Sequence, residues 1–284
     1  EKMINLVTVC GHNTTMLKHM LNHYKDIVDD IFVVVYLSSD KDKVLSEVNE
    51  ITRDLNIDIH RKTFEEPFNW ERVTQLYNET KLLRPNDWWI ISDDDEFHLY
   101  PKPINKLIED CEEHGYKFIT GAFLDRIGKG GIFPKINDDS DIWKEFPFVG
   151  SFRHPISNAC PNKTVVVRGD IKITNGQHYA MIDNEDTYGD RWNHPLRYPI
   201  EKCFIQVHHF KWDSSVINRL RDVSRLKKSY TYHEEYKRMF DYIVDNNFRI
   251  DIKDSRFMIE ESGNIFSQYP HWDVIRKKSI EFRT

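Results

Sequence analysis

Apolar and polar positions alternate along the first half of the chain as they do where short strands are separated by helices. Short apolar runs predict buried strands, and apolar residues that recur at every third or fourth position predict amphipathic helices. Strands are predicted over residues 6–10, 31–37, 57–60, 88–91 and 117–123. Helices are predicted between them over residues 16–24, 44–55, 70–83 and 103–113. This alternation predicts an α/β fold with a mostly parallel central sheet that is flanked by helices.

The pattern changes after residue 128. Residues 128–162 are rich in glycine, proline, asparagine and aromatic side chains, which is typical of a long loop region that lines a site. Residues 164–168 and 171–174 alternate in the manner of an antiparallel hairpin.

The end of the chain is predicted to be helical. One helix is expected soon after residue 214 and a second over residues 233–245. We therefore expect a main domain, residues 1–213, and a C-terminal helical extension, residues 214–284, packed on it.

The most informative stretch begins with the predicted strand 88–91. Two tryptophans and two isoleucines predict that this strand is buried, and Asp93, Asp94, Asp95 and Glu96 follow it almost at once. Open α/β sheets bind ligands at the carboxyl ends of their strands. Carboxylates this close repel one another by a few kcal/mol, and a divalent cation with oxygen ligands, Mn²⁺ or Mg²⁺, would compensate them. A solvated acidic turn is the alternative, but it gives no reason for the buried strand.

Composition narrows the classes of function. With 284 residues, 39% of them hydrophobic, the chain can build a core, and a net charge of -6 argues against general nucleic-acid binding. No apolar run is long enough to predict a transmembrane segment. The four cysteines show no C-x-x-C spacing, which is typical of a cytoplasmic protein, either free or peripheral at a membrane. Dinucleotide oxidoreductases and P-loop enzymes are poor candidates, because both of their glycine-rich motifs are missing.

The order of these parts resembles the GT-A fold of nucleotide-sugar glycosyltransferases, in particular glycosyltransferase family 2 with its D-x-D-E-F motif. The resemblance covers residues 4–213 and rests on four places. These are Gly11-His12-Asn13 with the helix after it, Asp93-Asp94-Asp95-Glu96-Phe97, Leu124-Asp125-Arg126 and His208-His209-Phe210-Lys211-Trp212.

The resemblance implies that a sugar moves, with inversion, from a nucleoside-diphosphate sugar to a hydroxyl of an acceptor such as a glycan. A Mn²⁺ or Mg²⁺ ion would stabilise the leaving diphosphate. Asp95 would bind the ion directly, and Asp93 would contact the ion or the ribose. A late histidine commonly completes the metal shell, and His209 matches best, with His178 and His208 as rivals.

The resemblance also implies the remaining site residues. The nucleotide-sugar site would comprise Thr8, Cys10, His12, Asn13, Asp40, Asp93, Asp94 and Lys211, although Asp40 equally fits a helix cap. The general base would be Asp125, with Glu185 and Asp186 as alternatives. The acceptor would contact Arg126, Trp143, Phe148 and Trp192, since aromatic faces suit sugar rings. Each of these aromatic residues fits equally well as an anchor of the loop region.

Three other functions stay open at this point. A nucleotidyltransferase of related layout would use the same carboxylates on a nucleoside triphosphate. A metal-dependent phosphoesterase would need a second metal-binding cluster, for which the histidine segments are candidates. A carbohydrate- or nucleotide-binding module without activity would leave the acidic residues unexplained.

Overall fold

A computed structural model describes residues 2–187, 194–200, 202, 205–227 and 232–261. By their internal contacts the residues form two compact units. Unit 1 comprises residues 1–121 and 162–206, and unit 2 comprises residues 122–161 and 207–284. The boundary predicted at residue 213 separates a main domain from a C-terminal extension. It is a different division from that into compact units, and it stays a prediction.

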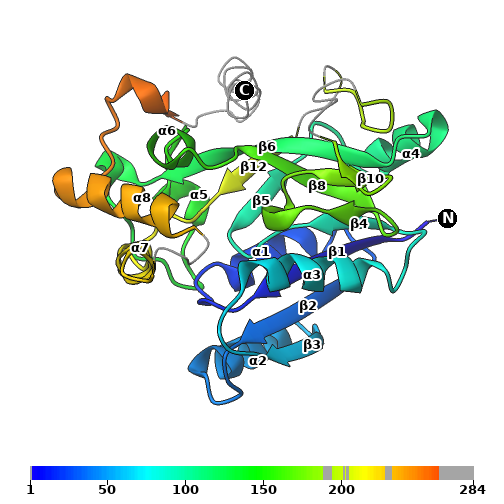
Figure 1. Cartoon of the computed structure of the whole chain (residues 1–284), viewed down its shortest axis with the longest axis horizontal. Coiled ribbons are helices and arrows are strands. Elements are labelled where there is room, and N and C mark those ends of the chain that lie inside the picture. Colours follow the sequence, from blue (N-terminus) through cyan, green and yellow to red (C-terminus); the bar gives the residue numbers. More distant parts are fainter. Residues whose placement is uncertain (1, 188–193, 201, 203–204, 228–231, 262–284) are drawn as a thin grey trace. The chain divides into compact units, whose positions relative to one another are not determined.

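The sheet of unit 1 has a parallel centre. Its strands are β1 (Ile4–Cys10), β2 (Asp30–Leu37), β3 (Ile59–Phe64), β4 (Trp88–Ile91) and β8 (Asn162–Arg168). They lie in the order β8-β4-β1-β2-β3 (Figure 1). Strand β1 pairs in parallel with β2 and with β4, β2 pairs in parallel with β3, and β8 is antiparallel to β4. The predicted α/β class with a mostly parallel sheet is thus confirmed.

Four helices flank this sheet, and local signals explain where they begin and end. They are α1 (Leu17–Tyr24), α2 (Lys43–Asp54), α3 (Trp70–Lys81) and α4 (Ile104–His114). The carboxylate of Asp42 caps α2 by accepting from the amide of Val44, and the amide oxygen of Asn69 caps α3 in the same way. Gly115 ends α4 in the left-handed conformation, which glycine adopts without steric cost.

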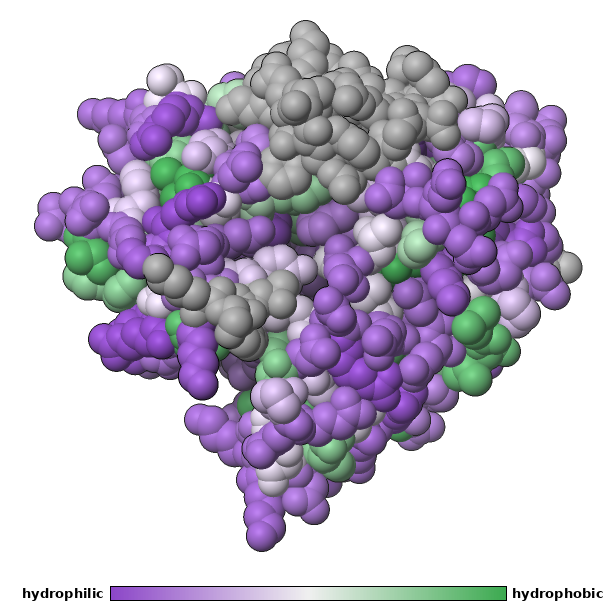
Figure 2. Space-filling model, in the orientation of Figure 1, coloured by the Kyte–Doolittle hydropathy of each residue, from purple (hydrophilic) through white to green (hydrophobic). Residues whose placement is uncertain are grey.

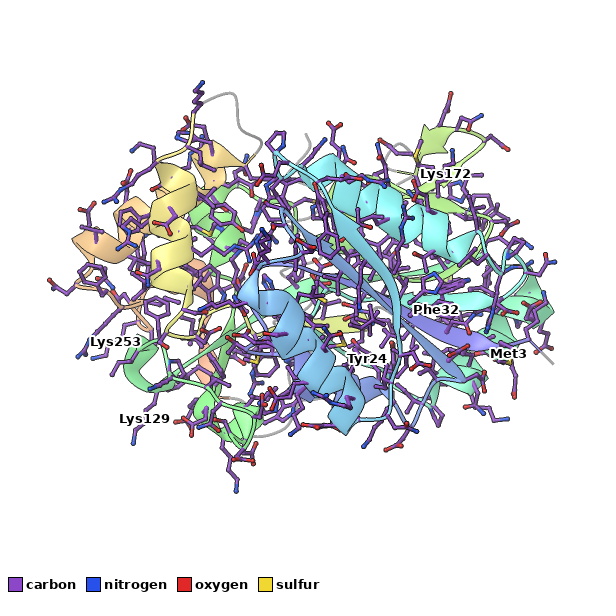
Figure 3. The ribbon with its side chains drawn as sticks, turned by 90° about the horizontal axis from the view of Figure 1, so that it is seen from below. Met3, Tyr24, Phe32, Lys129, Lys172 and Lys253 are labelled. Atoms are coloured by element: carbon purple, nitrogen blue, oxygen red, sulfur yellow. The ribbon has the colours of Figure 1, made fainter. Side chains whose placement is uncertain are left out.

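One face of the unit 1 sheet carries a large apolar core. The indole of Trp89 is fully buried there against Phe32, which Figure 3 labels on β2, with ring centroids 5.0 Å apart. The indole nitrogen of Trp89 donates to the carbonyl oxygen of Arg84, so burying it leaves no polar atom unsatisfied. Strand β4, which contains Trp89, is buried on both faces, and this explains its continuous apolar sequence.

Unit 1 also contains shorter elements. They are β5 (Glu96–Leu99), β9 (Lys172–Ile173), the 3₁₀ turn η2 (Asn175–Gln177), β10 (Ala180–Ile182) and β11 (Glu185–Asp186). Strands β9, β10 and β11 form a small antiparallel sheet, on which Lys172 is labelled in Figure 3. The predicted hairpin of 164–168 with 171–174 is therefore wrong: the first segment pairs with β4 and the second with β10.

The chain passes between the units within β6 (Phe118–Ile127) and within β12 (Ile205–His209). Because β6 is longer than the predicted strand 117–123, Asp125 and Arg126 lie inside it rather than after its end. Burial of all ten residues explains this extension.

Unit 2 combines short strands with helices. Its further elements are η1 (Lys129–Gly131), α5 (Ile142–Glu145), β7 (Phe148–Gly150), α6 (Arg153–Ser157), α7 (Val216–Ser224), α8 (His233–Asp245), η3 (Ser255–Phe257) and β13 (Glu260–Glu261). Strand β7 pairs with residues 125–127 of β6 and with β13. Helix α8 packs on α6 and α7. The predicted helix 233–245 is confirmed, whereas the loop region 128–162 contains more regular structure than expected.

The surface is predominantly hydrophilic on the face drawn in Figure 2, where hydrophobic residues form separate small patches. Isolated exposed apolar side chains are normal for a folded protein. Among the described helices, none combines the length and the apolar composition that crossing a bilayer requires.

Gly11 offers a test of the sheet edge at which β1 ends. A Cβ atom at Gly11 would overlap the backbone carbonyl of Tyr36, which cannot move without disturbing β2. We expect Gly11→Ala to lower the free energy of unfolding by about 3 kcal/mol in urea titrations. Gly115→Ala is the control: its added methyl meets no atom but occupies a left-handed φ of 75°, so about 1 kcal/mol is expected. Equal losses in the two variants would contradict the close approach at Gly11.

Candidate active site

Four carboxylates lie at the carboxyl end of β4 in unit 1. We call Asp93, Asp94, Asp95 and Glu96 the acidic motif. Strands β1 and β4 run in parallel with Val7 opposite Ile91, so both strands end at the same edge of the sheet. The three aspartates are partly buried, and Glu96 is buried where β5 begins. This is the place in an open α/β sheet where ligands bind.

Tyr77 of α3 holds the first carboxylate of the motif. Its hydroxyl donates to Asp93 Oδ1 at 2.5 Å and accepts from the amide of Val9 at 3.2 Å. Burial, and after it the negative charge of Asp93, raises the pKa of Tyr77 well above its ordinary value. The phenol therefore stays protonated at neutral pH and donates to Asp93.

Lys163 of β8 lies beside the same motif. The antiparallel register sets Ile90 opposite Val166, and three residues further along the pair brings Lys163 level with Asp93. The ammonium lies 3.1 Å from Glu96 Oε2 and 3.7 Å from Asp93 Oδ2. Two unlike carboxylates thus share one buried cation.

His178 has a fixed ring orientation in unit 1. Its Nδ1 lies 2.7 Å from the carbonyl oxygen of Asn162, while the side-chain amide of Asn162 donates to the carbonyl oxygen of His178. Because a carbonyl can only accept, Nδ1 carries the proton. This pair of hydrogen bonds fixes the ring against Asn162.

The residues predicted at the end of β1 differ in exposure. Thr8 and Cys10 are buried within the strand, whereas His12 and Asn13 follow it. Burial, and then the negative charge of Asp94, raises the pKa of the Cys10 thiol, which therefore stays neutral. The ring of His12 packs against Phe68 and Trp70, at centroid distances of 4.8 and 5.3 Å.

Three other predicted residues of unit 1 are exposed. Asp40 lies in the turn after β2, and the capping role that competed for it belongs to Asp42 instead. Glu185 and Asp186 form the edge strand β11.

Asp125 is the buried polar centre of unit 2. Its Oδ2 accepts from the amides of Phe152 and Arg153, at 2.8 and 2.9 Å. Its Oδ1 accepts from the indole of Trp212 at 3.0 Å and lies 3.3 Å from His209 Nδ1. Burial raises the pKa of Asp125, but the hydrogen bond and the charge of His209 outweigh it, together with the hydrogen bonds from the Arg153 amide and the Trp212 indole. The pKa therefore lies below its ordinary value.

The Asp125 carboxylate in turn fixes His209. An ionised carboxylate accepts only, so Nδ1 of His209 bears the proton that it donates to Asp125. Histidines that bind metals commonly donate their other ring nitrogen to such a carboxylate.

The predicted acceptor residues lie in unit 2 or outside the described residues. Arg126 is buried, donates to the carbonyl oxygen of Phe146 and lies over the rings of Trp143 and Phe210. Burial lowers the pKa of Arg126 to about 10. Trp143 and Phe148 are partly exposed. Trp192 lies outside the described residues.

Lys211 is engaged with a tyrosine. Its ammonium donates to the hydroxyl of Tyr236 at 2.9 Å and lies 4.5 Å from the centre of that ring. Burial raises the pKa of Tyr236, but the positive charges of Arg219, Lys211 and Arg153 outweigh it and lower the pKa to about 8. The Lys211 charge thus contributes to a basic environment within unit 2.

Unit 2 also has a hollow of about 530 Å³ beside the end of α8, with Lys253, labelled in Figure 3, on its wall. Its other walls include Asn246, Arg249 and Asp251. None of the predicted site residues lines it.

Several side-chain contacts could not be predicted from the sequence. Tyr77 occupies one of the apolar positions of a helix, and only the folded structure shows that its hydroxyl donates to Asp93. Lys163 could not be placed from the sequence because the predicted hairpin is wrong. The pairing of β8 with β4 is what brings it to the acidic motif. Nothing in the sequence marks Tyr236 as more than a helix position.

Comparisons with known proteins add little. No family model matches the sequence, and no curated protein matches it. Solved structures with a partial likeness include S. aureus TarS, at 12% identity and a TM-score of 0.36, covering 99% of this chain and 49% of that one. TarS 1-349 in complex with UDP-GlcNAc has 12% identity and a TM-score of 0.36, covering 99% and 81%. A 4-diphosphocytidyl-2C-methyl-D-erythritol synthase has 14% identity and a TM-score of 0.32, covering 60% and 77%.

This chain spans about half the length of the first of these structures. At such TM-scores the likeness carries no argument about function. The conclusions below therefore depend on the residues.

Asp125 gives a prediction about stability. In Asp125→Asn an amide nitrogen replaces an oxygen that accepts two hydrogen bonds, so two of the four donors lose their acceptor within a buried site. We therefore expect a loss of about 3 kcal/mol in urea unfolding at pH 7. Because the folded pKa of Asp125 is depressed, the loss should shrink as the pH falls below about 4, where the wild-type carboxyl also becomes protonated. Asp241→Asn, at an exposed helix position, should change stability by less than about 0.5 kcal/mol. A loss that small in Asp125→Asn would contradict the buried role.

Tyr236 gives a prediction about pH. Since its folded pKa of about 8 lies below the ordinary value of 10, ionisation favours the folded state, and this stabilisation grows as the pH rises from 8 to 10. The stability of the wild type relative to Tyr236→Phe should therefore increase over this range, by up to roughly 2–3 kcal/mol. The tyrosinate absorbance of the folded wild type should show a step near pH 8 that Tyr236→Phe lacks. A step present in both proteins would refute the assignment.

Proposed function

We propose that this protein is a metal-dependent glycosyltransferase of the GT-A type. It would transfer a sugar from a nucleoside-diphosphate sugar to a hydroxyl of an acceptor, for which a glycan is the candidate. One observation carries the proposal: four consecutive carboxylates follow a buried parallel strand at the sheet edge where β1 also ends. Diphosphate chemistry gives this placement a purpose, because the carboxylates could hold a cation against the leaving group.

The donor atoms of the motif suit Mn²⁺ or Mg²⁺. Both ions prefer oxygen ligands and are usually held by one or two carboxylates together with substrate phosphates. We assign Asp95 as a direct ligand and Asp93 as a ligand of the ion or of the ribose. When bound, the ion would neutralise charge on the departing diphosphate. The fixed orientation of Asp93 by Tyr77 supports a preformed site.

His209 and His178 stay the candidate histidine ligands. In both rings Nδ1 donates to an acceptor, the Asp125 carboxylate or the Asn162 carbonyl, and metal-binding histidines are commonly oriented by such a hydrogen bond. The carboxylate partner makes the His209 ring the more basic of the two, and this favours His209.

For the general base we place Glu185 or Asp186 ahead of Asp125. A base must accept the proton of the attacking hydroxyl. Both oxygens of Asp125 already accept hydrogen bonds, whereas Glu185 and Asp186 are exposed. In the proposed step the base takes the hydroxyl proton, the acceptor oxygen bonds to the anomeric carbon, and the bond to the phosphate oxygen breaks. A single displacement of this kind inverts the anomeric centre.

The other assignments follow the same logic. His12 and Asn13 lie at the end of β1 and suit the nucleotide, with Asp40 in the turn after β2 as a further candidate. Trp143 and Phe148 are exposed enough to meet an acceptor, while buried Arg126 would act by holding Trp143 in place. The cytoplasmic location stays a prediction.

The decisive experiment measures thermal stability with nucleotides and Mn²⁺. A nucleoside diphosphate at a hundred times its Kd should raise the Tm by roughly 5 °C in the presence of Mn²⁺ and far less in excess chelator. Asp95→Asn should abolish this metal-dependent rise and the turnover of the sugar nucleotide, while its own Tm stays within about 2 °C of wild type. Asp58→Asn, an exposed carboxylate of the same unit, should behave as wild type.

Other outcomes identify the rival functions. Release of pyrophosphate from a nucleoside triphosphate would favour a nucleotidyltransferase. Stabilisation by free sugar alone would favour a binding module, and hydrolysis of phosphate esters would favour a phosphoesterase. Full turnover in excess chelator, or in Asp95→Asn, would refute the metal mechanism.

A further inference from the structure

The acidic motif has a positive partner within the chain itself. Lys163 is 2% exposed, and its ammonium lies 3.1 Å from Glu96 Oε2, a carboxylate that is itself 1% exposed. The same ammonium lies 3.7 Å from Asp93 Oδ2. Burying a lysine without a partner is costly, so its place here must be secured by these carboxylates.

The remaining contacts of Lys163 hold it in one position. Its ammonium also donates to the carbonyl oxygen of Gly176 at 2.9 Å and to Gln177 Oε1 at 3.1 Å, both in the η2 turn. The side-chain amide of Gln177 donates in turn to Thr74 Oγ1 on α3, at 3.0 Å. The three protons of the ammonium are thus directed at three acceptors from two segments of unit 1, the acidic motif and the η2 turn.

This arrangement divides the motif into two parts. Asp93 is held from one side by the Tyr77 hydroxyl and from the other by Lys163, and Glu96 forms the closer ion pair with Lys163. The carboxylates at the two ends of the motif are therefore oriented by the protein, and Asp94 and Asp95 lie between them. A loop whose ends are fixed presents its middle in one conformation.

We propose that Lys163 is a positioning residue of the metal site: it orients Asp93 and Glu96 so that the acidic motif is preformed for a divalent cation. The proposal rests on the proposed function of the motif and deepens it. Lys163 itself would touch neither the cation nor the substrate. Loss of a residue that orients ligands in this way typically weakens metal binding by roughly 10- to 100-fold.

The charge and the orientation of the pair have opposite effects on cation binding. Lys163 and Glu96 together are neutral, so the pair adds no net charge against an incoming cation. In Lys163→Met the buried Glu96 loses the ion-pair partner that orients it. The variant site is one unit more negative, but we expect the lost orientation of Asp93 and Glu96 to outweigh this charge, so cation binding should weaken.

The test measures Mn²⁺ binding to the folded protein directly. The electron paramagnetic resonance signal reports the Mn²⁺ that remains free in solution. Lys163→Met should raise the Kd for Mn²⁺ at least tenfold and lower kcat, and saturating Mn²⁺ should not restore kcat fully. Lys163→Arg, which keeps the charge and the donors, should recover most of the affinity. If Lys163→Met fails to fold, Lys163→Gln keeps a polar end without the charge and should show the same weakening.

Lys81→Met is the matched control. Lys81 is 1% exposed in the same unit, but its ammonium donates to the carbonyl oxygen of Ile171 and to Asn78, not to the acidic motif. Its loss should cost stability while leaving the Kd for Mn²⁺ within twofold of wild type. Weakening equal to that of Lys163→Met would show a general effect of lost stability and overturn the proposal.

The two proposals fail in different ways. If wild-type protein binds Mn²⁺ and Lys163→Met binds it equally well or more tightly, the positioning role is overturned and the proposed function stands. If wild-type protein binds no Mn²⁺ with or without a nucleoside diphosphate, the metal-dependent function fails, and the role of Lys163 fails with it.

Discussion

The antiparallel pairing of β8 with β4 is the constraint on which the candidate site of unit 1 depends. Strand β4 ends in four carboxylates, and only a strand that runs the other way can bring its first residues to that end. Asn162 and Lys163 are those residues: the first orients His178 and the second neutralises Glu96. This one pairing therefore places the Lys163 ammonium at the acidic motif and sets Asn162 where it orients His178. A parallel strand at this place would have brought Arg168 there instead.

Repulsion within the motif is compensated in part before any ligand binds. Clustered carboxylates in the sequence predict a positive partner, and a divalent cation is the partner that we expect. The structure adds a second partner, since Lys163 takes up the charge of Glu96 and shares that of Asp93. The two compensations are not exclusive. The buried lysine pairs with Glu96 and Asp93, and under the proposed function a divalent cation would bind at the partly buried aspartates together with substrate phosphates.

The predictable part of this protein is what local sequence encodes. Apolar runs predicted the strands β1, β2 and β4 and the helices between the strands, because burial on both faces produces an unbroken apolar sequence. Strand β3 is partly exposed, and the predicted strand 57–60 overlaps it only at Ile59 and His60. Partner choice was beyond the sequence: residues 164–168 and 171–174 look like a hairpin, yet β8 gains more by covering β4 beside the buried Trp89. The carboxylates of the site could be listed from the sequence for the same local reason. Tyr77, Lys163 and Tyr236 could not, since each acts through a contact distant in the chain.

Burial separates the carboxylates by role more clearly than their positions in the chain do. Asp125 accepts four hydrogen bonds inside unit 2, and its depressed pKa means that it stays ionised without being able to collect a proton at neutral pH. A general base must exchange its proton with substrate and solvent, so saturation of every acceptor site argues for an orienting role. Glu185 and Asp186 on the exposed strand β11 meet that requirement. In unit 1 the same contrast holds between buried Glu96, which pairs with Lys163, and partly buried Asp95, which is the proposed metal ligand.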